Sequence, residues 1–174
     1  MKKVLLGVTG SIAAYKAAEL TRLFAKNGDE VRVVMTPAAC EFVRPLTFQT
    51  LSRNPVFVDQ FAAPDEWRPE HVSLAEWADI VVVAPATANT IAKMAHGIAD
   101  NLLAATLLAT RAPVAVAPAM NDGMWLAPAT QENIDVLKKR GVKVVQPRDG
   151  DLACGARGVG RMAEPKEIFE ELCR

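Results

Sequence analysis

The sequence has no excess of charge of either sign. Lysine and arginine together number 20, aspartate and glutamate together number 20, and the formal net charge at pH 7 is zero. Proteins that bind nucleic acids need a basic surface, because cationic side chains neutralise the phosphates and release their counterions. The balanced composition therefore argues against a nucleic-acid-binding protein.

Long uninterrupted apolar runs are also missing. Pro, Asn or Asp breaks the strongest of them within about ten residues, whereas a membrane-spanning helix needs about 20. Residues 1–14 imitate an export signal, since two lysines precede an apolar segment that ends in small residues. However, this segment runs without a break into a helix-like apolar repeat over residues 14–24, which a cleaved signal has no reason to carry. We therefore expect a cytoplasmic protein that has no membrane partner.

Cysteine and histidine are scarce. The sequence has three cysteines, Cys40, Cys154 and Cys173, which is a small and odd number and does not suit a disulfide framework. It has no Cys-x-x-Cys pair and no His-rich cluster. We therefore predict no metal site. Two interpretations of the cysteines stay open at this point: three inert thiols, or one functional thiol. The candidate is Cys154, because Ala153 and Gly155 are small and leave it accessible.

The apolar residues form short β-branched runs that alternate with helical patterns. Continuously apolar runs are typical of parallel strands that are buried on both faces. The alternation predicts a single α/β domain over residues 1–174, with a doubly wound parallel sheet between two layers of helices. Residues 54–70 and 147–163 have loop composition, and so long a loop is often a binding segment. The predicted strands span residues 3–8, 30–35, 79–84, 113–118 and 142–146, and the predicted helices span 12–27, 45–52, 88–110, 128–140 and 164–173.

Four consecutive predicted strands end in small polar residues, and none of these residues is a carboxylate. In a doubly wound sheet, ligands bind beyond the carboxyl ends of the strands. Gly10 and Ser11 open a helix whose free N–H groups suit a phosphate, although the same turn could merely cap the helix. The dinucleotide pattern G-x-G-x-x-G is absent. We therefore predict a mononucleotide site built from Thr9-Gly10-Ser11, Thr36-Pro37, the run Pro-Ala-Thr-Ala-Asn-Thr (85–90) and Pro-Ala-Met-Asn (118–121).

The two histidines have different contexts. His71 stands at the start of a short helical stretch that leads into the third predicted strand. From this position alone, a catalytic and a structural role are equally good interpretations. His96 lies inside a predicted helix, where a solvated or packed side chain is the simpler interpretation.

Four motifs occur in a fixed order on these predicted elements: GVTGSIAAYK (7–16), PATANT (85–90), PAMN (118–121) and ACG (153–155). Their combination resembles the flavin-dependent cysteine decarboxylases, and among them it is most similar to the phosphopantothenoylcysteine decarboxylases of coenzyme A biosynthesis. The resemblance spans nearly the whole chain. It implies a flavodoxin-like fold, bound FMN, and a homotrimer or a dodecamer of trimers with flavin sites at subunit interfaces. It also implies a phosphopantothenoylcysteine synthetase, either fused to this domain or separate.

The resemblance assigns roles to individual residues. His71 would be the active-site base, Asn121 would hold the substrate carboxylate, and Cys154 would be the proton donor. The substrate site would further include Met120, Ala153 and Gly155. The residues expected at the flavin are Gly10, Ser11, Ile12, Thr36, Thr87, Ala88, Asn89, Thr90 and Ala119.

The implied reaction explains these residue types. A cysteine carboxylate cannot simply lose carbon dioxide, because the remaining carbanion has no electron sink. Hydride transfer from the thiol-bearing carbon to flavin creates that sink, while the protein controls orientation and protons. The neutral amide of Asn121 would hold the carboxylate without the strong pairing that stabilises the ground state. The product of 4′-phosphopantothenoylcysteine would be 4′-phosphopantetheine.

Three other interpretations remain open. A peptidyl-cysteine decarboxylase would share the flavin site, His71 and Asn121, but it would not need the ACG segment. A flavin prenyltransferase would share the fold, although the PAMN and ACG segments argue against it. A non-catalytic flavin-binding regulatory relative would typically lack one of the three catalytic residues, all of which are present.

Overall fold

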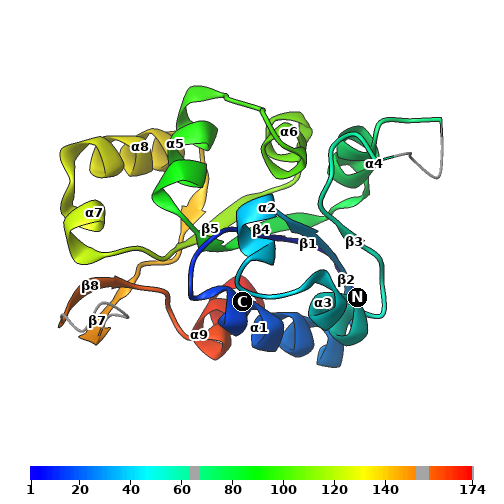
Figure 1. The fold of residues 1–174 in the computed structure, drawn as a ribbon, viewed down its shortest axis with the longest axis horizontal. Helices are drawn as coiled ribbons and strands as arrows, with labels where there is room; N and C mark the ends of the chain where they lie inside the picture. The colour runs from blue at the N-terminus through cyan, green and yellow to red at the C-terminus, as the bar shows by residue number, and fades with distance from the viewer. Residues whose placement is uncertain (63–66, 152–156, 174) are drawn as a thin grey trace.

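The structure is a computed structural model that describes residues 1–62, 67–151 and 157–173. Within these residues, six parallel strands form one sheet in the order β3–β2–β1–β4–β5–β6 (Figure 1). This confirms the predicted doubly wound, flavodoxin-like α/β fold. The strands are β1 (Lys3–Val8), β2 (Glu30–Met35), β3 (Val56–Phe57), β4 (Ile80–Ala86), β5 (Val114–Pro118) and β6 (Lys143–Val144).

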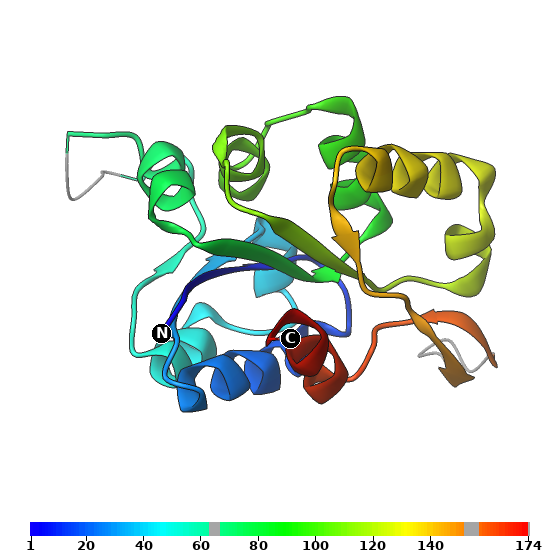
Figure 2. The same cartoon turned by 180° about the vertical axis from the view of Figure 1, so that it is seen from behind.

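Helices cover both faces of the sheet, as Figure 2 shows from behind. Successive side chains of a strand point to opposite faces. In β1, Leu6 therefore packs beneath one helical layer and Leu5 beneath the other. Burial of each such side chain contributes about 1.5–3 kcal/mol. One layer contains α1 (Ala14–Lys26), α3 (Pro45–Ser52) and α9 (Pro165–Cys173), and the other contains α4 (Glu70–Trp77), α5 (Ala88–His96), α6 (Leu102–Ala109) and α8 (Pro128–Lys139).

The prediction of one helix over residues 88–110 is wrong. The chain forms α5 and α6 with residues 97–101 between them. Gly97 ends α5 in the left-handed conformation (φ 69°), a role that glycine fills without steric cost. Asn101 then begins α6, because its side-chain oxygen accepts a hydrogen bond from the main-chain N–H of Ala104 at 2.9 Å. The apolar periodicity continues across this break and therefore hides it.

The two stretches with loop composition also contain regular structure. Residues 54–70 include β3, an edge strand that pairs with β2 at only two positions and is too short for a periodic pattern. Residues 147–163 include β7 (Arg148–Asp151) and β8 (Arg157–Arg161), which form an antiparallel hairpin. β8 is rich in glycine and lacks an alternation of apolar and polar residues. Its position is determined by packing against residues 120–122 and not by a local sequence pattern.

Two further short helices complete the described chain. α2 (Pro37–Cys40) follows β2, and α7 (Asp122–Leu126) follows β5. None of the helices in the described ranges combines the length and the apolar character that a membrane crossing requires.

Candidate functional site

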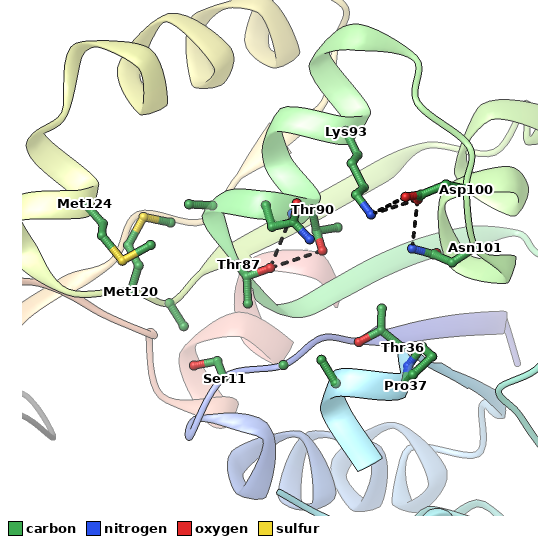
Figure 3. A pocket seen from close by; sticks show the side chains of 15 residues that line it. Ser11, Thr36, Pro37, Thr87, Thr90, Lys93, Asp100, Asn101, Met120 and Met124 are labelled. Carbon is green, nitrogen blue, oxygen red and sulfur yellow. Dashed lines mark hydrogen bonds and ion pairs between the residues drawn. The ribbon is translucent and has the colours of Figure 1, made fainter. Parts of the chain in front are cut away.

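A cavity of about 630 Å³ opens at the carboxyl ends of the central strands. The strand order makes β1 and β4 neighbours although they are far apart in sequence, and their connections leave toward opposite faces of the sheet. Such a switch point leaves a crevice, which is where doubly wound proteins bind nucleotides. Figure 3 shows Ser11 on the β1 side of this crevice facing Thr87 and Thr90 on the α5 side. The wall consists of Gly10, Ser11, Thr36, Pro37, Ala38, Thr87, Ala88, Asn89, Thr90, Lys93, Asp100, Asn101, Ala119, Met120 and Met124.

Threonine side chains cap the N-termini of two helices that border the cavity. The side chain of Thr36 accepts a hydrogen bond from the main-chain N–H of Ala39 at 3.3 Å and so caps α2. The side chain of Thr87 caps α5 in the same way by accepting from the N–H of Thr90 at 3.3 Å. Each cap fixes the direction in which its helix leaves the strand.

The first turn of α5 offers hydrogen-bond donors to the cavity. The main-chain N–H groups of Thr87 and Thr90 already donate hydrogen bonds, to the hydroxyl oxygens of Thr9 and Thr87 respectively. By contrast, we find no acceptor for the main-chain N–H groups of Ala88 and Asn89 anywhere in the described ranges. Free N–H groups at a helix N-terminus attract anions, and this turn lines the cavity.

The charges in the cavity wall cancel. Lys93 and Asp100 form an ion pair in which their nitrogen and oxygen atoms lie 2.7 Å apart. The hydrogen bond from Lys93 is the main reason that the pKa of Asp100 lies below its ordinary value. The amide of Asn101 also donates to Asp100, at 3.3 Å (Figure 3). An anionic ligand would therefore rely on N–H and hydroxyl groups rather than on a free side-chain cation.

Asn121 lies beside the cavity and starts α7. Its neighbour Met120 is part of the cavity wall. The side-chain oxygen of Asn121 accepts a hydrogen bond from the main-chain N–H of Gly123 at 2.9 Å, and its carbonyl oxygen accepts from the N–H of Trp125. These bonds fix the exposed Asn121 directly after the wall residue Met120.

Most of the residues predicted at the flavin come together in this cavity. The exception is Ile12, which is 55% exposed and is not part of the wall. Of the predicted substrate residues, Met120 is in the wall and Asn121 adjoins it. Ala153, Cys154 and Gly155 lie outside the described residues. That these groups hold flavin or substrate stays a prediction.

His71 is half-buried near the start of α4, and it does not belong to the wall formed by the residues that the structure describes. α4 packs against α6, away from the turn between β1 and α1 (Figure 1). His96 is the exposed last residue of α5. Neither histidine is therefore placed inside the cavity of its own chain.

Several wall residues were not among those predicted from the sequence. Lys93 lies three residues after Thr90 on the same helix, so helical spacing could have identified it. Asp100 and Asn101 reach the cavity only because α5 ends at Gly97, which the single-helix prediction hid. The other wall residues that were not predicted are Ala38 and Met124.

The wall has few groups that could do chemistry by themselves. Its described residues include no histidine or cysteine, and their one carboxylate is paired. We also find no group of three or more His, Cys, Asp or Glu side chains in the described ranges that could hold a metal ion.

The fold and the cavity define an α/β protein of the mononucleotide-binding class. Residues 1–174 match the flavoprotein family, and the chain belongs to that family. It is 50% identical over 169 residues to the coenzyme A biosynthesis bifunctional protein CoaBC of Bacillus subtilis, covering 97% of this chain and 42% of that protein. It is 47% identical to the probable phosphopantothenoylcysteine decarboxylase of Streptococcus mutans, covering 98% and 97% of the two chains. The chain thus spans about two fifths of the bifunctional relatives and nearly all of the short one.

Solved structures are similar over the whole chain. A mutant PPC decarboxylase complexed with pantothenoylaminoethenethiol is 34% identical with a TM-score of 0.90, and the match covers 99% of this chain and 96% of that one. The peptidyl-cysteine decarboxylase EpiD is 27% identical with a TM-score of 0.84, and the match covers 99% and 98% of the two chains.

Proposed function

We propose that residues 1–174 form a single FMN-binding domain that decarboxylates 4′-phosphopantothenoylcysteine to 4′-phosphopantetheine in coenzyme A biosynthesis. The observation that carries this proposal is the donor-rich cavity, whose wall has no net charge, at the switch point of a flavoprotein-family chain, with Asn121 following the wall residue Met120. The names of the relatives, CoaBC and probable phosphopantothenoylcysteine decarboxylase, support the substrate. The enzyme would act in the cytoplasm, with the synthetase either fused to it or separate.

The cavity fits FMN in size and chemistry. Its volume of about 630 Å³ is within the usual range of about 300–1,000 Å³ for sites of small molecules and cofactors. FMN needs donors for a phosphate, hydroxyl partners for its ribityl chain and an apolar surface for its ring. The first turn of α5 and the turn at Ser11 supply the polar groups, while Ala119, Met120 and Met124 supply apolar surface.

The protein would hold and orient the substrate. FMN, when bound, supplies the hydride acceptor that oxidises the thiol-bearing carbon. Asn121 would bind the substrate carboxylate through its neutral amide, which orients that group without an ion pair that resists the loss of carbon dioxide. Cys154 would deliver the proton that completes the product.

A second copy of the chain would bring His71 to this site. His71 lies outside the cavity wall of its own chain, whereas the proposed reaction gives it a role as base. A homotrimer, or a dodecamer of such trimers, with each cavity at a subunit interface would resolve this separation. The exposed apolar side chains of Tyr15, Phe42 and Leu46, which are 50–68% exposed, would supply surface for such contacts.

A peptidyl-cysteine decarboxylase is the second candidate, because the chain is similar to EpiD over almost its full length. The greater identity to the phosphopantothenoylcysteine-type relatives favours the coenzyme A precursor.

Flavin uptake tests the first step of the proposal. Purified protein titrated with FMN should acquire a bound-flavin absorption spectrum with one FMN per chain, and riboflavin should bind more weakly because it lacks the phosphate. A protein that takes up no FMN would overturn the proposed function. Equal affinity for riboflavin would overturn a phosphate site at the Ser11 turn and the first turn of α5.

A further inference from the structure

Thr9 follows the last residue of β1, and its side chain is 1% exposed. Its hydroxyl donates a hydrogen bond to the carbonyl oxygen of Pro85 at 2.7 Å. The same hydroxyl oxygen accepts a hydrogen bond from the main-chain N–H of Thr87 at 3.1 Å. One buried side chain therefore connects the end of β1 to the turn between β4 and α5.

The reason for this connection lies in the strand pairing. The parallel register of β1 and β4 runs from Val4 beside Ile80 to Gly7 beside Val83 and goes no further. Pro85 has no N–H to offer, and the register between β4 and β5 also shifts after Val83. A hydroxyl can donate and accept a hydrogen bond at the same time. Thr9 can therefore join the end of β1 to the end of β4 beyond the last main-chain pairing of these strands.

The two segments that Thr9 joins form facing sides of the cavity (Figure 3). On the β1 side, the carbonyl oxygen of Thr9 accepts from the N–H of Ser11 at 2.8 Å and shapes that turn. On the α5 side, Thr87 is held by its N–H while its own hydroxyl caps the helix. The position of the free donors at Ala88 and Asn89 therefore follows from the position of Thr9.

We propose that Thr9 is a positioning residue of the flavin site. Its hydroxyl sets the separation between the Ser11 turn and the first turn of α5, and thereby the affinity for FMN. Thr9 need not touch the ligand, because it is not part of the cavity wall that the described residues form. This inference rests on the proposed function in that FMN is taken as the ligand.

Thr9→Val tests the role of the hydroxyl, because valine has nearly the same shape and can make neither hydrogen bond. Thr9→Ser keeps the hydroxyl. Thr106→Val is the matched control: the Thr106 hydroxyl is also fully buried and donates to the carbonyl oxygen of Leu102 at 2.8 Å, but it lies within α6 and outside the cavity wall. FMN dissociation constants are measured by quenching of flavin fluorescence, with thermal unfolding recorded for each variant.

We expect Thr9→Val to weaken FMN binding by at least about tenfold, because each lost hydrogen bond leaves a buried partner unsatisfied. Thr9→Ser should bind within about threefold of the wild type, and Thr106→Val within about twofold, although both valine variants unfold at lower temperature. Wild-type affinity in Thr9→Val would overturn the inference. Equal weakening in Thr106→Val would also overturn it, because the effect would then be general destabilisation.

Hydrogen exchange separates this inference from the proposed function. In flavin-free protein, the main-chain N–H of Thr87 should exchange slowly in the wild type and in Thr9→Ser and much faster in Thr9→Val. Equal exchange in all three proteins would overturn the role of Thr9 even if FMN binds. If the wild type does not bind FMN but the exchange pattern is as expected, the proposed function is overturned. Thr9 would then still be the residue that connects the two turns.

Discussion

The main-chain N–H of Met120 donates a hydrogen bond to the carbonyl oxygen of Gly160 at 3.0 Å. This bond fastens the turn that carries Asn121 to strand β8. A side chain at Gly160 would overlap the carbonyl oxygen of Met120, and one at Gly158 would approach the Cβ of Asp122 to 2.7 Å. The glycines of β8 therefore allow the hairpin to lie directly against the site turn.

Gly160→Ala should displace this turn and impair the reaction more than flavin binding. We expect turnover to fall by at least about tenfold and stability to fall by about 1–3 kcal/mol, because the new methyl group meets main chain that cannot easily move. FMN affinity should change by less than the turnover, since Ser11 and the first turn of α5 are untouched. Turnover and FMN affinity are measured on the same preparations.

Gly150→Ala is the matched control for this prediction. Gly150 lies in the same hairpin with a similar φ (159° against 151° for Gly160), but its added Cβ would first meet the flexible end of Arg161. It should therefore share the backbone strain without displacing the site turn. Equal loss of turnover in both variants would show that the hairpin conformation, rather than its contact with Met120, determines activity.

Asn121→Asp should reduce decarboxylation without disturbing the fold or FMN binding. An aspartate oxygen can still accept the hydrogen bond from the main-chain N–H of Gly123, so α7 should keep its cap. Its negative charge would repel the substrate carboxylate, and we expect decarboxylation to fall by about 100-fold or more while FMN binding stays intact. Normal decarboxylation by this variant would contradict the role of the neutral amide.

Glu164 should make stability depend on pH in the acid range. It pairs with Lys16, whose side chain is only 9% exposed, at 2.9 Å. The hydrogen bond from Lys16 is the largest cause that lowers the pKa of Glu164, and Arg161 adds to it. A carboxyl whose pKa is lower in the folded state stabilises the fold above its unfolded pKa of about 4.3, and this contribution is lost as the pH falls through the folded pKa.

Glu164→Gln should consequently destabilise the fold by about 1 kcal/mol at pH 7, because the buried Lys16 ammonium loses a charged partner whose half-exposed carboxylate is partly screened by solvent. The difference from the wild type should shrink as the pH falls below about 4. Urea unfolding at several pH values measures it. Glu170→Gln, which removes an exposed ion pair with Lys166 on the same helix, should cost less than about 0.5 kcal/mol. A difference that grows toward acid pH would contradict the assignment.

Mixed oligomers should show whether His71 and Asn121 of different copies form one site. His71→Gln and Asn121→Asp should each be inactive alone. When the two are coexpressed, a site that draws these residues from two subunits should recover about a quarter of wild-type turnover, because random assembly places both native residues together at that frequency. Sites contained within one chain would recover no activity.

The sequence was sufficient to predict the central part of the fold. The runs that form β1, β2, β4 and β5 are apolar because both faces of these strands are buried, so pattern alone identifies them. β3 and the β7–β8 hairpin could not be predicted in this way. β3 has only two paired positions, and β8 is placed by contacts with a turn about 40 residues earlier in the chain.

The candidate site was predictable to a similar degree. Ser11, Thr36 and Thr87 follow buried strands, so the rule for doubly wound sheets places them at one edge. The place of Asp100 in the wall depends on where α5 ends, and the proposed role of His71 requires a second copy of the chain. Thr9 was predicted to belong to the site, but its two hydrogen bonds to the turn at residues 85–87 were not, because no local sequence pattern reveals a contact with a distant turn.

Release of carbon dioxide by the FMN-loaded protein is the most direct test of the proposed decarboxylase activity. 4′-Phosphopantothenoylcysteine and a peptide with a C-terminal cysteine are supplied in parallel, and labelled carbon dioxide is counted. We expect rapid release from the phosphopantothenoyl substrate, formation of 4′-phosphopantetheine in equal amount, and little release from the peptide. Release from the peptide alone, or no release from either by a protein that has bound FMN, would contradict the proposed activity.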